Sequence, residues 1–401
     1  MYNRPTQMEP LFPKEEKALV DLSMKVYAEA AELGGMVHPI TRKEIARLLR
    51  RINSYYSNLI EGESTTPADI EKAVKEEYNK DEEKKRLQLL SRAHIEVQKL
   101  IDDRFEENED INVCSTEFIC WIHKEFYERV PESFLAIKHP DKNTIITMVP
   151  GELRRENVSV GTHIAPTWES VPRFLKHFEE AYTSDSVLGH KKLIVAAASH
   201  HRLAWIHPFL DGNGRVTRLF TYAFMRKAGI ASHGLWTLSR GLARKTENYK
   251  NMLASADSER EGDYDGRSNL SERALTGFTT FLFKVADDQI SYLKKLLALE
   301  ALYNRIKGYV AMRADNMLPD EKPLREEATY VLAEVMMRGE IARGEVPRLI
   351  GLGERSATAL IKQLLEEELV VSDSHKAPIR FHIPAKVVGY YFPDLYPAGS
   401  I

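Results

Sequence analysis

Residues 207–218 are His-Pro-Phe-Leu-Asp-Gly-Asn-Gly-Arg-Val-Thr-Arg, and they say more about the fold than any other stretch of the chain. Pro208 interrupts the preceding helical pattern, and the Gly-Asn-Gly triplet at 212–214 predicts a loop. A helix follows at once, because apolar residues from Val216 to Phe224 recur at i, i+3, i+4, i+7 and i+8. Successive backbone N–H groups at such a helix N-terminus form an anion site. The stretch therefore predicts a phosphate-binding loop between two helices.

The side chains of this stretch supply groups that phosphate chemistry uses. Arg215 and Arg218 project together away from the apolar face, and two guanidinium groups suit a polyphosphate better than a lone carboxylate. Asp211 is a hard oxygen ligand, suited to the Mg²⁺ that accompanies nucleotide phosphates. His207 has the side chain that most readily takes a proton at neutral pH. Each residue alone is more often structural, but their combination indicates a site.

Residues 207–218 resemble the Fic family signature, His-x-Phe-x-(Asp/Glu)-Gly-Asn-Gly-Arg-x-x-Arg, at every defined position, and residues 114–285 resemble a Fic core. Most members of that family transfer AMP from ATP to a hydroxyl group of a target protein. The resemblance implies that His207 deprotonates a target Ser, Thr or Tyr. It also implies ATP and Mg²⁺ as cofactors, with Asp211 as the metal ligand.

The resemblance implies further roles for the same loop. Residues 212–214 would cradle the α- and β-phosphates, Arg215 would neutralise developing charge, and Arg218 would grip the γ-phosphate. Phe209 would anchor the loop in the core. The implied nucleotide-binding set in this loop is Phe209, Leu210, Asp211, Gly212, Asn213, Gly214, Arg215 and Arg218. The implied catalytic set is His207, Asp211, Asn213 and Arg215.

Two other segments resemble parts of the family's site. Residues 151–164 resemble the flap hairpin that covers the nucleotide and binds a target protein by strand addition. The flap residues taken from this resemblance are Val160, Gly161, Thr162 and His163. Residues in the place of the family's adenine pocket are Tyr249, Lys250 and Asp257. Members of the family often show Tyr-Tyr and Asn there, so this chain departs from the pattern.

Residues 41–60 form an amphipathic helical pattern, with Thr41 as the expected N-cap and Gly62 just past the end. Its last residues match the family's inhibitory motif, (Ser/Thr)-x-x-x-Glu-(Gly/Asn). The resemblance implies that Glu61 pairs with Arg218 and competes with the γ-phosphate, steadied by Ser57 on the same face. In some members this glutamate also helps to remove AMP, and the sequence leaves that role open.

The helical period dominates the whole chain and predicts a mainly α protein. We expect an N-terminal helical region at 1–110 with the inhibitory motif at 57–62, and a Fic helical core with a short β-hairpin flap at 111–290. Residues 291–401 would form linker helices and a winged-helix-like domain. There, two helices at 325–338 and 354–368 with a short one between them precede a β-hairpin.

Composition limits the partners. The chain has 56 basic and 59 acidic residues, so its formal charge of −3 excludes a globally basic nucleic-acid binder. Residues 320–401 contain 10 Lys/Arg and 13 Asp/Glu, which disfavours DNA binding by the winged helix and favours protein contacts. The two cysteines match no zinc or redox spacing. The sequence shows neither a membrane span nor a signal peptide, so we expect a cytoplasmic protein without membrane contact.

Three alternatives stay open at this point. One is transfer of another group from a phosphate donor, as a kinase does. The family's Doc branch replaces Gly-Asn-Gly-Arg with a different loop, whereas this chain keeps it at 212–215, which favours AMP. The second is a transcription regulator that senses a nucleotide and uses the winged helix. A homodimer also stays open.

Overall fold

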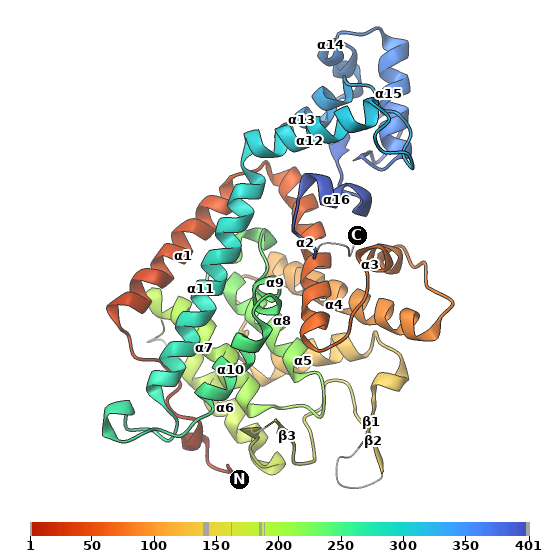
Figure 1. Ribbon diagram of the computed structural model, residues 1–401. Coiled ribbons are helices and arrows are strands. Elements are labelled where there is room, and N and C mark those ends of the chain that lie inside the picture. Colours follow the sequence, from red (N-terminus) through yellow and green to blue (C-terminus); the bar gives the residue numbers. More distant parts are fainter. Residues whose placement is uncertain (1, 139–143, 162, 184–186, 188, 398–401) are drawn as a thin grey trace.

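The computed structural model describes residues 2–138, 144–161, 163–183, 187 and 189–397 (Figure 1). The described chain is mainly helical, with sixteen α-helices and seven short strands, which confirms the expected fold class. Short 3₁₀ turns lie at Pro5–Met8, Glu132–Phe134, Trp168–Ser170, Ser232–Gly234, Asp263–Asp265 and Arg343–Glu345. None of the described helices is both long and apolar enough to cross a membrane.

The N-terminal region supplies a long helix and the helix that ends at the candidate inhibitory motif. Its four helices are α1 (Lys17–Gly35), α2 (Pro39–Ile60), α3 (Pro67–Val74) and α4 (Glu82–Glu107). Gly62 has a positive φ of 84° and follows the end of α2, as expected of a C′ glycine. The expected N-cap is wrong: His38 caps α2, while Thr41 lies inside the helix. The Thr41 hydroxyl donates instead to the carbonyl oxygen of Met336 at 2.7 Å, a tertiary contact that local sequence does not encode.

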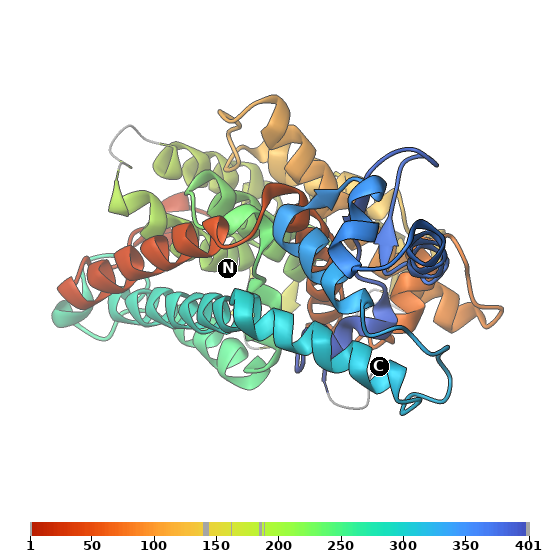
Figure 2. The ribbon, with the colours of Figure 1, turned by 90° about the horizontal axis from the view of Figure 1, so that it is seen from above.

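The central part of the chain packs around α7, which is buried on nearly every side. Helices α1, α6, α8 and α11 all contact it, which explains why its sequence lacks a polar face. Figure 2 shows α1 lying alongside the long helix α11. The helices of this part are α5 (Thr116–Tyr127), α6 (Val171–Tyr182), α7 (His190–Ile206), α8 (Asn213–Lys227), α9 (Leu238–Ala243), α10 (Thr246–Ala256) and α11 (Glu272–Leu297).

Two small antiparallel hairpins lie at one end of this helical body (Figure 1). Strand β1 (Ala136–Lys138) pairs with β2 (Ile145–Thr147). Strand β3 (Ser159–Val160) pairs with β4 (His163–Ile164), so the expected flap region does form a hairpin. The flap residue Thr162 lies outside the described residues.

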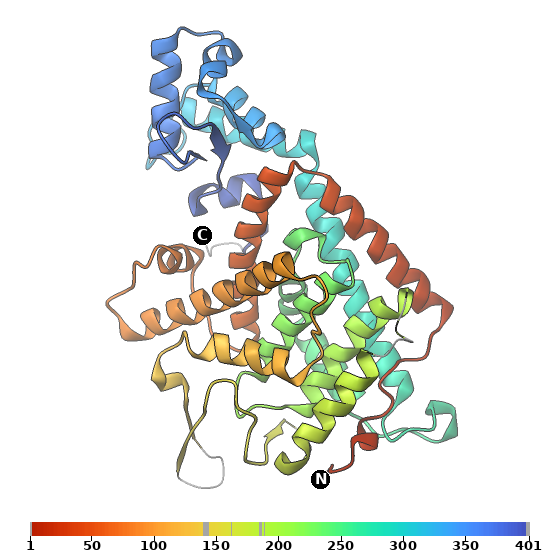
Figure 3. The same ribbon diagram turned by 180° about the vertical axis from the view of Figure 1, so that it is seen from behind.

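The C-terminal unit lies at the opposite end of the molecule from the hairpins (Figure 3). Its helices are α12 (Leu299–Ala314), α13 (Ala328–Arg338), α14 (Val346–Ile350), α15 (Glu354–Glu366) and α16 (Ala385–Tyr391). Strands β6 (Val370–Val371) and β7 (Ile379–Phe381) form the expected hairpin, and β5 (Glu340–Ile341) adds a third strand against β7 that the sequence did not predict.

The C-terminal unit also holds α2. Tyr56 Oη donates to the carbonyl oxygen of Leu395 at 3.1 Å, and Arg51 Nη2 donates to that of Ile383 at 3.2 Å. Helix α2 therefore lies between the C-terminal unit and the central helices, and its last residues reach the motif loop.

Candidate functional site

The motif loop between α7 and α8 is held in one conformation by its own residues. Asn213 exchanges two hydrogen bonds with the backbone of Phe209, at 2.9 and 2.8 Å, so its amide closes the loop. Gly212 has a φ of 78°, and a Cβ added there would lie 2.2 Å from Tyr127 Oη. Only glycine fits this position, both for its backbone conformation and for the close approach of the tyrosine.

A cavity of about 710 Å³ lies beside this loop. Eleven of the residues expected from the sequence line it: Glu61, Val160, Gly161, His163, His207, Asn213, Gly214, Arg218, Tyr249, Lys250 and Asp257. The lining also includes residues that the sequence did not indicate, among them His201, Trp205 and Leu253. The other expected residues that the structure describes lie outside this lining: Ser57, Phe209, Leu210, Asp211, Gly212 and Arg215.

His207 follows α7 in a left-handed conformation, with φ 50° and ψ 62°. Its Nδ1 lies 3.2 Å from the carbonyl oxygen of Ala204, which can only accept, so Nδ1 carries the proton and Nε2 keeps a lone pair. Burial lowers the pKa of His207 to about 4, although the Ala204 carbonyl acts in the opposite direction. The ring is therefore neutral at pH 7 and able to accept a proton.

Arg154 ties the flap segment to the motif loop, a role for which the sequence carries no signal. Its side chain is 2% exposed and donates to the carbonyl oxygens of His207 (2.7 Å), Glu156 (2.8 Å) and Pro166 (2.5 Å). Its backbone N–H donates to the carbonyl of Pro208 at 2.9 Å. Burial lowers the pKa of this guanidinium to about 10. The contacts hold the unusual backbone conformation of His207.

Glu61 occupies the N-terminal end of α8. Its Oε1 accepts a hydrogen bond from Arg218 Nη2 at 2.7 Å, across 157 residues of sequence. A Cβ added to Gly214 would lie 2.3 Å from the same oxygen, so the carboxylate sits directly on the motif loop. Burial would raise the pKa of Glu61, but the nearby Arg218 and Arg215 outweigh it and hold that pKa below its usual value. The Glu61 carboxylate is thus held beside two arginines at the N-terminal end of α8.

The buried polar face of α2 supports both arginines. Arg218 Nε donates to Ser57 Oγ at 2.9 Å and Nη2 donates to the Ser57 carbonyl at 2.9 Å. Arg215 Nε donates to Asn58 Oδ1 at 3.2 Å. The sequence did not indicate that Asn58 belongs to this site. A signal was present, because Ser54, Ser57 and Asn58 form a row of polar residues on an otherwise apolar face of the helix.

Phe209 and Asp211 flank the loop on its core side. Phe209 is fully buried and stacks on His123, with ring centroids 3.9 Å apart. The Asp211 carboxylate lies 3.4 Å from Tyr127 Oη, and among the described residues no lysine or arginine forms an ion pair with it. Phe209 therefore packs into the core beside the loop, and the side-chain oxygens of Asp211 make no ion pair with a described lysine or arginine.

Helix α10 forms another wall of the cavity. Tyr249 Oη lies 2.7 Å from His200 Nε2, and burial raises the pKa of this tyrosine to about 12, so it stays neutral. Lys250 lies beside it and is exposed. Asp257 Oδ1 lies 3.0 Å from His201 Nε2. His201 lies on the apolar helix α7, and a histidine in such a pattern carries no sign in the sequence of what it faces.

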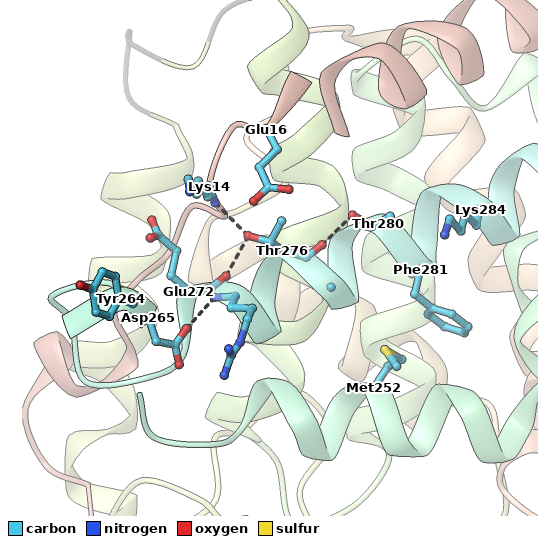
Figure 4. A pocket seen from close by; sticks show the side chains of 12 residues that line it. Lys14, Glu16, Met252, Tyr264, Asp265, Glu272, Thr276, Thr280, Phe281 and Lys284 are labelled. Carbon is cyan, nitrogen blue, oxygen red and sulfur yellow. Dashed lines mark hydrogen bonds between the residues drawn. The ribbon is translucent and has the colours of Figure 1, made fainter. Parts of the chain in front are cut away.

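A second hollow, of about 570 Å³, lies between the N-terminal segment, α10 and α11 (Figure 4). The side chains of Lys14, Glu16, Met252, Tyr264 and Phe281 border it. None of the motif residues reaches it, so it is separate from the candidate site.

Comparisons with known proteins match part of this chain to one family. The model of the Fic/DOC family matches residues 113–225. Two curated relatives named protein adenylyltransferase Fic, from Drosophila erecta and Aedes aegypti, are each 38% identical over 79 residues. That match covers 20% of this chain and 16% of each relative, so the chain spans only a small part of their length.

Two solved structures share the fold. A Fic family protein from Desulfovibrio desulfuricans G20 gives a TM-score of 0.51 at 16% identity, covering 93% of this chain and 98% of that one. A Fic domain containing signaling protein from Bacteroides thetaiotaomicron gives a TM-score of 0.51 at 17% identity. That match covers 69% of this chain and 97% of the other chain. With a matching motif, a matching family model and a shared fold, this chain carries a domain of the Fic/DOC family at residues 113–225.

Proposed function

We propose that this protein transfers AMP from ATP to a hydroxyl side chain of a target protein, and that Glu61 inhibits the transfer. The observation that carries the proposal is a single cavity that joins a neutral histidine, the N-terminus of α8 and Arg218. The histidine supplies a base, while the helix N-terminus and the guanidinium supply a site for phosphates. The curated relatives named protein adenylyltransferase Fic support AMP as the group that is transferred.

The residues would act by position and charge. Nε2 of His207 takes the proton of the target hydroxyl, whose oxygen forms a bond to the α-phosphorus. The bond from that phosphorus to the bridging oxygen breaks, and pyrophosphate leaves. The backbone at Gly214 and the Arg218 guanidinium hold the phosphates in line for this attack, which is the larger part of catalysis in phosphate transfer. Arg154 keeps His207 in place through its backbone carbonyl.

Asp211 fits the Mg²⁺ that would accompany ATP. Its carboxylate makes no ion pair with a described lysine or arginine and provides hard oxygen donors. The described residues contain no cluster of three or more acidic, His or Cys side chains that could hold a metal. Asp211 would therefore share the ion with phosphate oxygens and water, an arrangement that Mg²⁺ commonly adopts. The bound ion would neutralise charge on the phosphates.

Glu61 would inhibit by competition for Arg218. The carboxylate contacts the Arg218 guanidinium, which would hold the γ-phosphate, and lies against Gly214, which would hold the α- and β-phosphates. Ser57 orients the guanidinium toward it. An ATP molecule that enters while this ion pair persists lacks its γ-phosphate contact and is held out of line for transfer.

The flap would bind the target as an added strand. Strands β3 and β4 form a two-stranded hairpin with both edges free of other described strands. Val160 and Ile164 are 50% and 52% exposed, so the hairpin offers apolar side chains next to the cavity. A target segment paired along this hairpin would bring its hydroxyl residue to His207.

The test uses the Glu61→Gly variant with ATP labelled on either the α- or the γ-phosphate, together with a cell lysate. Label from the α-position on a protein band, absent with Glu61→Gly/His207→Ala, is the expected result. Transfer of the γ-label instead would establish a kinase-like reaction and refute AMP transfer. Mass spectrometry of the modified protein identifies the group and the target residue.

A further inference from the structure

The chain after α16 packs against the back of α2, the helix that ends at the inhibitory motif. Residues 393–396 lie beside Tyr55 and Tyr56, which helical spacing places on the face of α2 turned away from the motif loop. The Tyr56 hydroxyl donates to the carbonyl oxygen of Leu395 at 3.1 Å. The rings of Tyr55 and Tyr396 meet edge to face, with centroids 5.2 Å apart. All four side chains are buried.

The same segment is fixed to the central helices through its backbone. Tyr292 of α11 donates to the carbonyl oxygen of Pro393 at 2.7 Å. Arg240 of α9 donates from Nη2 to the carbonyl oxygen of Asp394 at 2.6 Å and from Nε to that of Leu395 at 3.3 Å. Three consecutive carbonyl groups thus accept from side chains of the central helices, so the segment bridges α2 to α9 and α11.

The buried guanidinium of Arg240 depends on these carbonyl groups. It forms no ion pair with a carboxylate of the described residues, and its other hydrogen bond goes to the amide oxygen of Gln289 at 2.9 Å. It also lies over the ring of Tyr292, 3.9 Å from the centroid. A buried cation that loses its acceptors is costly. The groove between α2, α9 and α11 therefore favours an extended backbone segment that supplies carbonyl oxygens.

The last two turns of α2 face the motif loop with polar side chains. Ser54 donates to the carbonyl oxygen of Ser91 at 2.8 Å, and Ser57 Oγ accepts from Arg218 Nε at 2.9 Å. Hydrogen bonds of this kind contribute modest net stability, because water can replace either partner. The contacts on the opposite face therefore decide a measurable part of how firmly these turns stay beside the loop.

We infer that residues 393–396 act as a latch on α2, and that their displacement frees Glu61 from Arg218 and activates transfer. The inference rests on the proposed function, in which Glu61 inhibits. The latch belongs to the C-terminal unit and holds α2 from behind. A movement of that unit that withdraws the latch would therefore change activity without touching the nucleotide.

The first test weakens the latch by one hydrogen bond at a time. Tyr56→Phe and Tyr292→Phe each remove a hydroxyl that donates to the latch and keep the ring. Each should raise AMP transfer about 3- to 10-fold, which is the population shift expected from one neutral hydrogen bond. Tyr292 is the sharper probe, because its hydroxyl bonds to the latch and not to α2.

Tyr182→Phe is the matched control. It removes another buried tyrosine hydroxyl, which donates to the carbonyl oxygen of Leu11 at 2.8 Å and is not part of the latch. It should lower the melting temperature by a similar amount and leave AMP transfer unchanged. Equal activation by Tyr182→Phe would show that general destabilisation raises transfer, and would overturn the inference.

The same substitutions in the Glu61→Gly background separate the latch from a direct effect on catalysis. The inhibitory carboxylate is then absent, so Tyr56→Phe should change transfer by less than about twofold. Activation of the same size in both backgrounds would mean that Tyr56 acts independently of Glu61, and would also overturn the inference.

Hydrogen exchange gives a readout that needs no target protein. Backbone amides of residues 54–61 should exchange about 3- to 10-fold faster in Tyr56→Phe and Tyr292→Phe than in Tyr182→Phe. If Glu61→Gly transfers AMP but neither latch variant exceeds Tyr182→Phe in exchange and transfer, the inference is overturned and the proposed function stands. If Glu61→Gly shows no transfer, the proposed function fails and the inference fails with it.

Discussion

The Glu61→Gly substitution tests the contact that most directly limits the proposed activity. It removes a charge-assisted hydrogen bond of 2.7 Å to Arg218 and clears the carboxylate from Gly214. Hydrogen bonds to charged groups contribute about 1.5–3 kcal/mol, and the Glu61 side chain is 32% exposed, so the lower half of that range applies. We therefore expect kcat/KM for AMP transfer to rise about 10- to 50-fold.

The same substitution changes stability in a calculable direction. Arg218 keeps its hydrogen bonds to Ser57 Oγ and to the Ser57 carbonyl, so its buried charge is not left without partners. The free energy of unfolding without nucleotide should fall by about 1–2 kcal/mol, less than the 3–5 kcal/mol typical of a stranded buried charge. Urea unfolding measures this directly.

Two further variants sharpen the comparison. Glu61→Gln keeps a neutral hydrogen-bond acceptor for Arg218, a contact worth about 1 kcal/mol. It should therefore raise AMP transfer less than Glu61→Gly does. Glu63→Gly introduces a glycine two residues later and removes a carboxylate that pairs with Arg86 at 2.9 Å, away from the cavity. The reasoning is refuted if Glu63→Gly activates as much as Glu61→Gly, or if Glu61→Gly is no more active than wild type.

The pH dependence of this contact has a definite sign. The pKa of Glu61 is lowered in the folded protein, so its stabilising contribution is complete above the unfolded pKa of about 4.3 and is lost as pH falls through the folded value. The stability difference between wild type and Glu61→Gln should therefore be full at pH 7 and shrink below about pH 4. A difference that persists unchanged in acid would contradict an ionic contact.

Three other predictions concern the motif loop and its support. His207→Ala in the Glu61→Gly background should lower transfer by about 10²–10⁴-fold while ATP binding by calorimetry changes little, and near-normal turnover would refute the base role. Because burial lowers the pKa of His207 to about 4 and the base must be neutral, transfer by Glu61→Gly should stay level as pH falls to about 5 and then drop. A midpoint near the free histidine value of about 6.5 would show that the ring is not desolvated. Arg154→Met should lower the free energy of unfolding by about 3 kcal/mol, roughly 1 kcal/mol for each of the three carbonyls that its side chain satisfies. It should also lower kcat more than it changes KM for ATP, because it positions His207 without touching the nucleotide, and a change in KM alone would contradict this.

Local chemistry made much of the motif loop predictable. Pro208, Gly212 and Asn213 restrict the backbone or bond to it within four residues, so their effects are encoded where they stand in the chain. The same holds for Gly62, whose positive φ ends α2 as expected. The N-cap at Thr41 failed because its hydroxyl bonds to Met336, and no local pattern reports a partner that far along the chain.

The sequence by itself determined a helical protein with an anion-binding loop, because helical periodicity and glycine-rich turns depend on neighbouring residues. Only the tertiary structure decided which side chains face that loop. From the residues alone Glu61 is a solvated glutamate next to a cap glycine, and family resemblance alone suggested its partner. The packing of α2 brings it to Arg218 across 157 residues. Asp257 and His163 likewise meet only because α10 and the flap border one cavity. Such contacts depend on how whole helices pack, and a charged side chain in the sequence carries no record of what packs against it.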